Sequence, residues 1–269
     1  MNLRDEFIKR LIEAKISSPR LETDIILKNS MPLYPNYTDE QETVAREYLS
    51  RRLNHEPLDK IIRKKEFYKY EFKVNNDVLS PRPDTEILVE KALEIIDKDK
   101  KYHIIDLGVG SGCIILSILK ERHNAKGIGI DISKKALSTA KENAKLLEVG
   151  DRITFINSDW NNIVKNNEEF DIIVSNPPYI PEYEYNELDI EVKKFDPIIA
   201  LVGGDDGLKC YREIADIASI ILKKGGYILL EVGYNQALDV IDIFSKKDFS
   251  IIEIAKDLSG INRCIILKK

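Results

Sequence analysis

From residue 101 onward the chain alternates short apolar runs with helical segments, and this rhythm most constrains the fold. Each run has the length of a strand, and turn residues separate it from the next element. Buried strands that alternate with helices specify a largely parallel sheet with helices on both faces. The predicted strands are 103–107, 126–130, 153–156, 172–174, 227–232, 251–255 and 264–267, and the predicted helices are 113–119, one capped by Ser133, 208–222 (stopped by Gly225 and Gly226) and 237–244. We therefore expect a doubly wound α/β sheet.

The first 57 residues carry the pattern of a small all-helical domain. Ser18 followed by Pro19 predicts an N-cap and a first-turn proline. Thr38 with Gln41 predicts a capping box for a third helix. The apolar stripe of the first helix is Leu3, Phe7, Ile8, Leu11 and Ile12. This segment lacks motif chemistry, so packing or docking is its expected role.

Residues 58–82 are predicted to join the two parts. Alternating apolar and polar residues within 66–74 predict a β-hairpin. Two prolines then stiffen the chain before a helix that begins near Glu86, for which Thr85 or Asp84 can be the cap. The predicted parts are a helical domain at 1–57, a hairpin linker at 58–82 and the sheet domain at 83–269.

Composition and charge limit the class of protein. The chain has 41 basic and 46 acidic residues, hence a net charge of −5, which weighs against binding to a phosphate backbone. Cys113, Cys210 and Cys264 are far apart, which favours reduced core thiols over a zinc site. No apolar run has transmembrane length, and the first ten residues lack a signal-peptide core. We expect a cytoplasmic protein that does not bind membranes, and nothing in the sequence demands more than a monomer.

A glycine-rich loop follows the first predicted strand of the sheet. Glycines at alternate positions, 108, 110 and 112, let the backbone turn tightly and approach a ligand at a helix N-terminus. The spacing differs from the dinucleotide fingerprint, which has two residues between its second and third glycines. A purely structural turn remains the alternative for this loop.

Polar and aromatic residues also follow the second and third predicted strands. Asp131 ends the second strand, where a carboxylate can accept both hydroxyls of a ribose. Asp159 and Trp160 follow the third strand, where an adenine ring would lie, although a lone tryptophan is equally well a core residue. Carboxyl ends of strands in open α/β sheets are where ligands bind. The pattern therefore predicts a nucleoside-containing cofactor at this edge.

The fourth predicted strand ends in Asn176, Pro177, Pro178 and Tyr179. Two prolines cannot donate to a sheet ladder and they stiffen the chain. The result is a rigid lip with one carboxamide and one aromatic ring. Carbonyl oxygens without neighbouring N–H groups make an acceptor-rich pocket that suits a planar NH2 group. An ordinary strand-to-loop turn is the alternative.

Together these features resemble the Rossmann-like S-adenosylmethionine-dependent methyltransferases. Further segments narrow the resemblance to the protein-(glutamine-N5) methyltransferases of peptide chain release factors. These segments are 80–86 (SPRPDTE), 106–112, 129–133, 175–180, 203–208, 231–233 (EVG) and 257–263. Two positions depart from the family's pattern, Val109 where threonine is usual and Asp196 where glutamate is usual. The sequence leaves open whether Arg82 and Glu86 are functional or structural.

The resemblance implies transfer of a methyl group to the glutamine side chain in the Gly-Gly-Gln loop of class-1 release factors. Asn176, Pro177 and Tyr179 are then the catalytic residues, and Pro178 joins them in binding the substrate. The implied S-adenosylmethionine contacts are Asp106, Gly108, Val109, Gly110, Ser111, Gly112, Asp131, Asp159, Trp160 and Asn176. No carboxylate or Cys/His cluster predicts a metal site.

Two other functions fit parts of the pattern. A DNA methyltransferase acting on the adenine amine shares the proline lip and would flip its base into the same pocket. The net charge and the lack of a basic target-recognition insert oppose that function. A non-catalytic module that only senses the cofactor would not require the lip.

Overall fold

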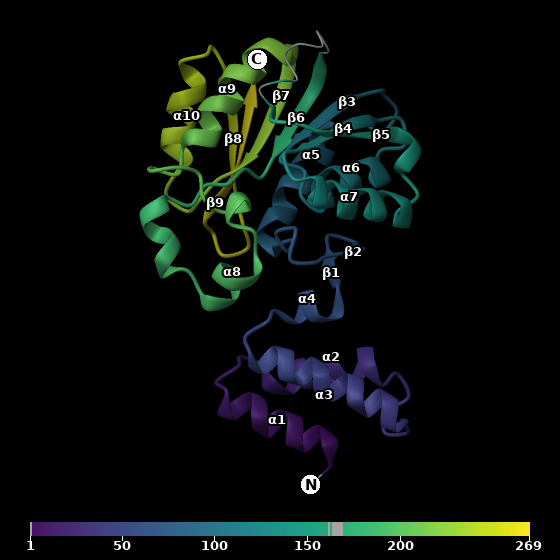
Figure 1. Ribbon diagram of the computed structural model, residues 1–269. Coiled ribbons are helices and arrows are strands. Elements are labelled where there is room, and N and C mark those ends of the chain that lie inside the picture. The colour runs from purple at the N-terminus through teal and green to yellow at the C-terminus, as the bar shows by residue number, and fades with distance from the viewer. Residues whose placement is uncertain (1, 161, 163–168) are drawn as a thin grey trace. The chain divides into compact units, whose positions relative to one another are not determined.

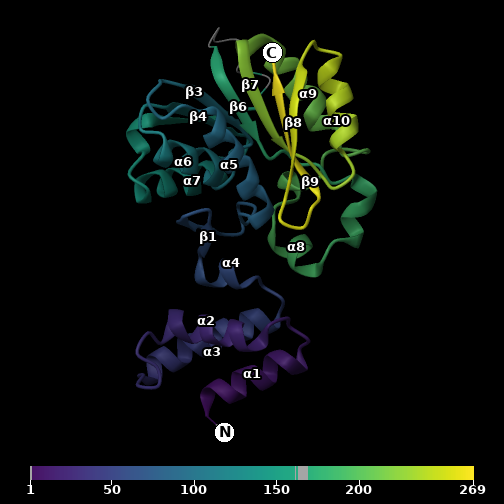
Figure 2. The same cartoon turned by 180° about the vertical axis from the view of Figure 1, so that it is seen from behind.

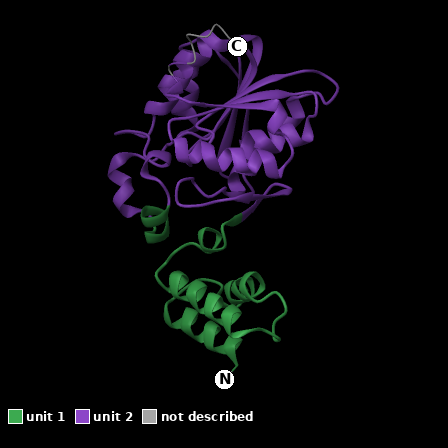
Figure 3. Ribbon diagram, turned by 45° about the vertical axis from the view of Figure 1, so that its right-hand side comes forward, with its two compact units in different colours: residues 1–64, 189–195 green, residues 65–188, 196–269 purple. Residues whose placement is uncertain are grey.

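The structure, a computed structural model, describes residues 2–160, 162 and 169–269, and it divides into two compact units (Figure 3). The helical unit consists of residues 1–64 and 189–195, and the sheet unit consists of residues 65–188 and 196–269. The chain thus leaves the sheet unit after residue 188 and returns to it at residue 196. The division into a docking domain, a linker and a sheet domain stays a prediction.

The helical unit is built around three longer helices and two short ones. Its helices are α1 (Leu3–Glu13), α2 (Pro19–Ser30), α3 (Asp39–Leu53), α4 (Leu58–Ile62) and α8 (Ile190–Phe195) (Figure 1). Phe7, Leu11 and Leu49 are fully buried in its core. Ile12, predicted to share the apolar stripe, is 58% exposed because it lies one residue further around the helix than Leu11.

The helix caps of this unit agree with the sequence in one case and differ in another. Thr38 and Gln41 form the predicted capping box of α3. α2 begins at Pro19 as predicted, but Ser18 has φ 54° and its side chain makes no capping hydrogen bond. Ser18 therefore occupies the predicted N-cap position, and its carbonyl accepts the Glu22 N–H, but its side chain does not cap the helix. The fixed φ of Pro19, which suits a first helical turn, suffices to start this helix.

A buried arginine holds α8 within the helical unit. The guanidinium of Arg52 lies 2.5 Å from Glu22 on α2 and 2.8 Å from Glu191 on α8, and Arg52 is only 3% exposed. A buried charge is strongly destabilising unless it is paired. The two carboxylates therefore fix α8 against α2 and α3.

The predicted hairpin is present as a separate two-stranded sheet of β1 (Lys64–Phe67) and β2 (Tyr70–Lys73). The 3₁₀ helix η1 (Pro83–Thr85) leads directly into α5 (Glu86–Ile95). That helix begins where the sequence predicts, yet the Thr85 side chain makes no capping hydrogen bond. Its hydroxyl donates instead to the carboxylate of Glu231.

The central sheet has seven strands in the order β5-β4-β3-β6-β7-β9-β8. Strands β5, β4, β3, β6 and β7 run parallel to one another, and β9 is antiparallel to both β7 and β8. The strands are β3 (His103–Leu107), β4 (Lys126–Asp131), β5 (Ile153–Asn157), β6 (Phe170–Ser175), β7 (Leu222–Glu231), β8 (Ser250–Lys256) and β9 (Asn262–Lys268). The predicted doubly wound α/β class is confirmed.

Helices cover both faces of this sheet (Figure 1; Figure 2 gives the view from behind). Neighbouring strand residues point to opposite faces, so Ile104 joins the core beneath α5, α6 and α7, and Ile105 joins the core beneath α9 and α10. The helices are α6 (Cys113–Glu121), α7 (Lys134–Leu146), α9 (Lys209–Ile221) and α10 (Ala237–Ser245), and the remaining 3₁₀ turns are η2 (Gly150–Arg152), η4 (Glu182–Glu187) and η5 (Ile198–Ala200). Ser133 caps α7 as predicted, since its Oγ accepts the Ala136 N–H.

One strand boundary differs from the sequence prediction. Gly225 and Gly226, predicted to stop a helix, lie inside β7, because α9 ends earlier, at Ile221. The pairing of β7 with β6 shifts register between Phe170 and Ile172 at this point. The glycines accommodate that irregularity within the strand.

Within the described residues, no helix is both long and apolar enough to cross a membrane.

A candidate active site at the carboxyl edge of the sheet

A cavity of about 460 Å³ lies within the sheet unit at the carboxyl ends of β3, β4, β5 and β6. This size suits a small-molecule ligand. Most of the predicted site residues line it: Gly108, Val109, Gly110, Ser111, Asp131, Asp159, Trp160, Asn176 and Pro178. Asp106, Gly112, Pro177 and Tyr179 do not line it. The topology therefore gathers residues from four strand ends at one place, as the sequence predicts.

The glycine loop joins β3 to α6 in a left-handed conformation. Gly108, Gly110 and Gly112 have φ values of 81°, 54° and 84°, which residues with a Cβ rarely adopt. The loop ends at Cys113, the first residue of α6, so that the helix N-terminus faces the cavity. Backbone N–H groups in such a place bind electronegative ligand atoms.

Asp131 is the last residue of β4 and bridges the glycine loop to α7. Its Oδ2 accepts the Gly110 N–H at 2.9 Å, and its Oδ1 accepts the Ser133 N–H at 2.8 Å. Burial raises the pKa of this carboxyl, and the two backbone donors oppose the shift. Each carboxylate oxygen keeps a further lone pair for a ligand hydroxyl.

Trp160 forms one wall of the cavity. A Cβ placed on Gly108 would lie 3.5 Å from Cζ3 of the indole, so the ring lies directly over the glycine loop. Its Nε1 donates to Glu213 on α9 at 3.0 Å. That hydrogen bond fixes the plane of the ring. The indole also packs against the core beneath α9 and α10, and its contact with an adenine ring stays a prediction.

Asp106 lies beneath the glycine loop. The residue is 1% exposed, and neither carboxyl oxygen has a hydrogen-bond partner among the described residues. Burial raises the pKa of this carboxyl to about 8. A direct contact of Asp106 with a cofactor stays a prediction.

The proline lip begins where β6 ends. The hydroxyl of Ser175 donates to the Leu107 carbonyl at 2.5 Å and ties β6 to β3. The amide nitrogen of Asn176 donates to the Thr85 hydroxyl at 3.3 Å. The Asn176 oxygen has no hydrogen bond among the described residues, so it remains an acceptor at the cavity wall.

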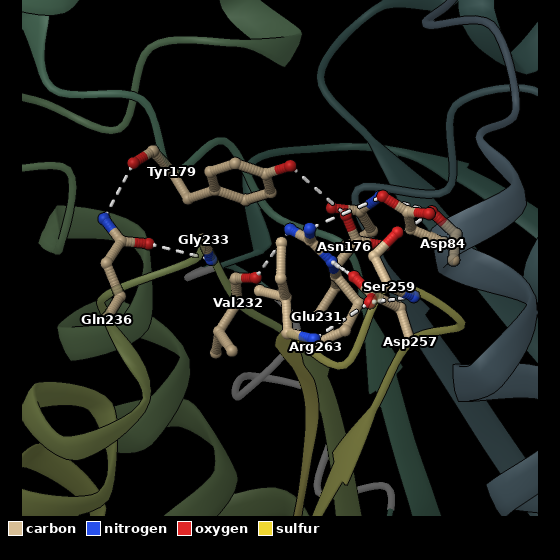
Figure 4. A network of polar contacts seen from close by, with 12 residues as sticks. Asp84, Asn176, Tyr179, Glu231, Val232, Gly233, Gln236, Asp257, Ser259 and Arg263 are labelled. Carbon is tan, nitrogen blue, oxygen red and sulfur yellow. Dashed lines mark hydrogen bonds and ion pairs between the residues drawn. The ribbon is translucent and has the colours of Figure 1, made fainter.

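Tyr179 is held at both its ends (Figure 4). Its hydroxyl donates to Glu231 at 3.3 Å, and its carbonyl accepts the Gln236 side-chain amide at 2.8 Å. Burial raises the pKa of this phenol. The ring packs against the core beneath α9 and α10, so a contact with an acceptor amide stays a prediction.

The loop 201–207 supports the lip from behind. The Ile180 N–H donates to the Leu201 carbonyl, and the Gly203 N–H donates to the Ile180 carbonyl, both at 2.9 Å. Gly207 has φ 73°, and a Cβ there would lie 2.4 Å from the Tyr179 carbonyl oxygen. Only glycine fits at this position.

Comparisons with known proteins agree with this geometry. A family model described as a methyltransferase domain matches residues 98–256. The release factor glutamine methyltransferase of Caulobacter vibrioides is 38% identical over 266 residues, which cover 96% of this chain and 92% of the relative. The chain belongs to the release factor glutamine methyltransferases.

Solved methyltransferase structures share the fold of this family member. A methyltransferase from Pyrococcus furiosus has a TM-score of 0.54 at 17% identity, with 74% of this chain and 88% of that one covered. A T. thermophilus 16S rRNA N2 G1207 methyltransferase, solved with AdoMet and guanosine, has a TM-score of 0.51 at 17% identity, with 77% and 49% covered. At these identities the likeness shows the fold alone.

The structure gives this family member's Arg82 and Glu86 structural partners. Arg82 pairs with the buried Asp196 at 2.9 Å, and Arg82 also lines the cavity. Glu86 accepts the Tyr68 N–H at 3.0 Å and so ties α5 to the hairpin turn. The shorter Asp196, one of the two departures from the family pattern, still reaches its arginine.

Sequence reasoning missed several residues of the site. Thr85 and Ser80 line the cavity, and the Ser80 hydroxyl is buried without a partner among the described residues. Glu231 is buried and accepts the hydroxyl of Tyr179, the last residue of the lip. All three fall in segments 80–86 and 231–233, whose family resemblance was the available signal. The thiol prediction needs one correction, because Cys113 and Cys210 line the cavity and only Cys264 is buried in the core.

Proposed function

We propose that this protein methylates the side-chain amide nitrogen of the glutamine in the Gly-Gly-Gln loop of class-1 peptide chain release factors. The observation that carries the proposal is the Asn176 carboxamide, whose oxygen accepts no hydrogen bond from the described residues and lies at the wall of a cofactor-sized cavity. Family membership supports the choice of a release factor glutamine as the acceptor.

The residues of the cavity fit S-adenosylmethionine. The Asp131 carboxylate accepts ribose hydroxyls with the lone pairs that Gly110 and Ser133 leave free. The Trp160 face offers a surface for adenine, and the glycine loop lets the cofactor approach the backbone closely. When bound, the cofactor supplies an electrophilic methyl group on a sulfonium. The hydroxyl of Ser80, which has no partner in the part of the chain that the structure describes, provides a further donor within the cavity.

The lip provides what a weak amide nucleophile needs. An amide nitrogen is poorly nucleophilic because its lone pair is delocalised into the carbonyl. The Asn176 oxygen and the Pro177 carbonyl are proposed to accept its two N–H bonds, which orients the lone pair and stabilises the positive charge that develops. No general base is required before the methyl group transfers. Pro178 shapes the cavity side of the lip, and Tyr179 anchors its end.

We also propose that the helical unit docks the release factor and that the protein acts as a monomer without stable binding to nucleic acid. The net charge of −5 supports the last point. A substrate that works on the ribosome would place the enzyme in the cytoplasm.

The deciding experiment offers release factor and DNA side by side to the purified protein with methyl-labelled S-adenosylmethionine. The label should enter the release factor and disappear when the loop glutamine is replaced by alanine. Label in DNA alone would instead support the adenine methyltransferase, which shares the lip.

A further inference from the structure

A buried carboxylate stands behind the proline lip and does not touch the cavity. Glu231, the last residue of β7, is 2% exposed and is absent from the cavity wall. One of its oxygens accepts the Thr85 hydroxyl at 2.5 Å, and the other accepts the Tyr179 hydroxyl at 3.3 Å. Figure 4 shows Glu231 in the same network of polar contacts as Asn176 and Tyr179.

The direction of these hydrogen bonds follows from the chemistry of the groups. An ionised carboxylate only accepts hydrogen bonds, so Thr85 must donate its single hydroxyl proton to Glu231. The Thr85 oxygen is then left as an acceptor. It takes a hydrogen bond from the amide nitrogen of Asn176 at 3.3 Å. An asparagine whose nitrogen is engaged in this way presents its oxygen on the other side.

We propose that Glu231 is a positioning residue, which acts through Thr85 to keep the Asn176 oxygen, and not its NH2 group, turned toward the acceptor glutamine. This inference rests on the proposed function, because it concerns the orientation of the Asn176 carboxamide in the same site. With the amide reversed, Asn176 would place a donor against the N–H bonds of the acceptor and would repel the charge that develops there.

The carboxylate that sets this orientation is itself close to its titration point at neutral pH. Burial raises the pKa of Glu231 to about 7, and Thr85, Arg263 and Tyr179 oppose the shift. Once protonated, the carboxyl can donate to Thr85. The direction of the two hydrogen bonds that link Glu231, Thr85 and Asn176 (the relay) is then no longer fixed. The ionisable groups that face Glu231 come from several elements, and they are Asp84, Tyr179, Tyr211, Arg263, Cys113 and Cys264.

The first test removes the relay without changing its shape. Thr85→Val keeps the volume and loses the hydroxyl, while Thr85→Ser restores it. At pH 8 we expect Thr85→Val to lower kcat roughly 10- to 100-fold, with cofactor affinity unchanged within about threefold, and Thr85→Ser to recover most of the rate.

Thr139→Val is the matched control. The Thr139 hydroxyl also accepts from an asparagine amide, that of Asn75 at 3.0 Å, and donates to a carbonyl, but it lies outside the cavity wall. We expect its kcat to equal that of the wild type. A Thr85→Val enzyme that keeps its kcat within threefold, or a Thr139→Val enzyme that loses as much, overturns the inference.

The second test separates positioning from packing through the pH profile. The wild-type kcat should rise between pH 6 and pH 8 with a midpoint near 7, and Glu231→Gln should be slower than wild type at pH 8 and lack this rise. An unchanged profile in Glu231→Gln contradicts the inference even if Thr85→Val does not fold. Failure of the wild type itself to methylate release factor would count against the proposed function instead, so the two failures are distinct.

Discussion

The guanidinium of Arg82 lies 2.9 Å from the carboxylate of Asp196, although 114 residues separate them in sequence. The Arg82 side chain is half-exposed, whereas that of Asp196 is 2% exposed. The pair ties the segment before α5 to the loop that carries Pro197 and Ile199, and both segments line the cavity. One wall of the site therefore depends on an ion pair whose acidic partner is buried.

Replacing Arg82 by methionine should destabilise the protein moderately. The buried Asp196 carboxylate then loses its cationic partner, while the exposure of Arg82 limits the effect to about 1 kcal/mol, or a decrease of about 2–4 °C in Tm. Thermal unfolding measures the change, and Arg82→Lys should retain most of the stability. Equal Tm values for Arg82→Met and the wild type would show that the pair contributes nothing.

Replacing Asn176 by alanine should abolish methyl transfer and leave cofactor binding in place. Without the carboxamide, the developing charge on the acceptor loses one fixed acceptor, and we expect kcat to fall roughly 100- to 1,000-fold. Transfer assays and calorimetric titration with cofactor give the two readouts. Asn124→Ala, at an exposed asparagine that bonds a backbone carbonyl, is the control. Near-normal turnover of Asn176→Ala would refute the mechanism.

Replacing Asp131 by alanine should have the opposite effect and weaken cofactor binding first. The ribose hydroxyls lose a charged acceptor, so cofactor affinity should fall about 10- to 100-fold. Asp131→Asn, which keeps one oxygen, should lose less. Calorimetric titration of the three proteins tests this order, and equal affinities would remove Asp131 from the cofactor site.

Replacing Gly207 by alanine should disturb the lip more than φ strain alone explains. A Cβ at this position meets the Tyr179 carbonyl oxygen at 2.4 Å, in addition to the unfavourable φ of 73°. Gly225→Ala is the matched control, because Gly225 has φ 82° and, apart from its chain neighbours, no heavy atom of the described residues lies within 4 Å of a Cβ there. We expect both variants to lose about 1 kcal/mol from backbone strain, but only Gly207→Ala to lose activity as well. Equal activities would show that the close approach is not needed.

Stability should fall as pH rises through neutrality in the protein without cofactor. The pKa of Asp106 is about 8 in the folded protein against an ordinary 3.8, and that of Glu231 is about 7 against 4.5. The folded state thus binds more protons than the unfolded state between these values. Each group contributes stability below its ordinary pKa and loses roughly 1.4 kcal/mol per pH unit across its window.

Asp106→Asn tests this sign. The neutral amide should roughly halve the pH dependence of the free energy of unfolding between about pH 5 and 7 and remove it between about pH 7 and 8, whereas Glu231→Gln should halve it only below about pH 7. Denaturant titrations at pH 5, 7 and 8 give the slopes. A slope for Asp106→Asn that matches the wild type would show that Asp106 ionises freely in the fold.

The sheet and the location of the site were predictable because both depend on local signals. Apolar runs and turn residues mark each strand, and parallel topology then brings Gly110, Asp131 and Asn176 to one edge. The hydrogen bonds that join Glu231, Thr85 and Asn176 were not predictable from pattern, since Thr85 and Glu231 are 146 residues apart and nothing in either segment indicates that they pair. Gly225 and Gly226 misled the prediction because the same dipeptide serves a helix stop and an irregular strand equally well.

The helical unit is built from two separate stretches of the sequence, residues 1–64 and 189–195, and the ion pair between Arg52 and Glu191 joins them. A fragment that ends at residue 64 retains Glu22 as a partner for Arg52 but lacks α8. Exchange of the first 64 residues between relatives would therefore bring together an arginine and an α8 that had not been selected as a pair. Recombination should succeed only when both stretches are inherited from the same parent.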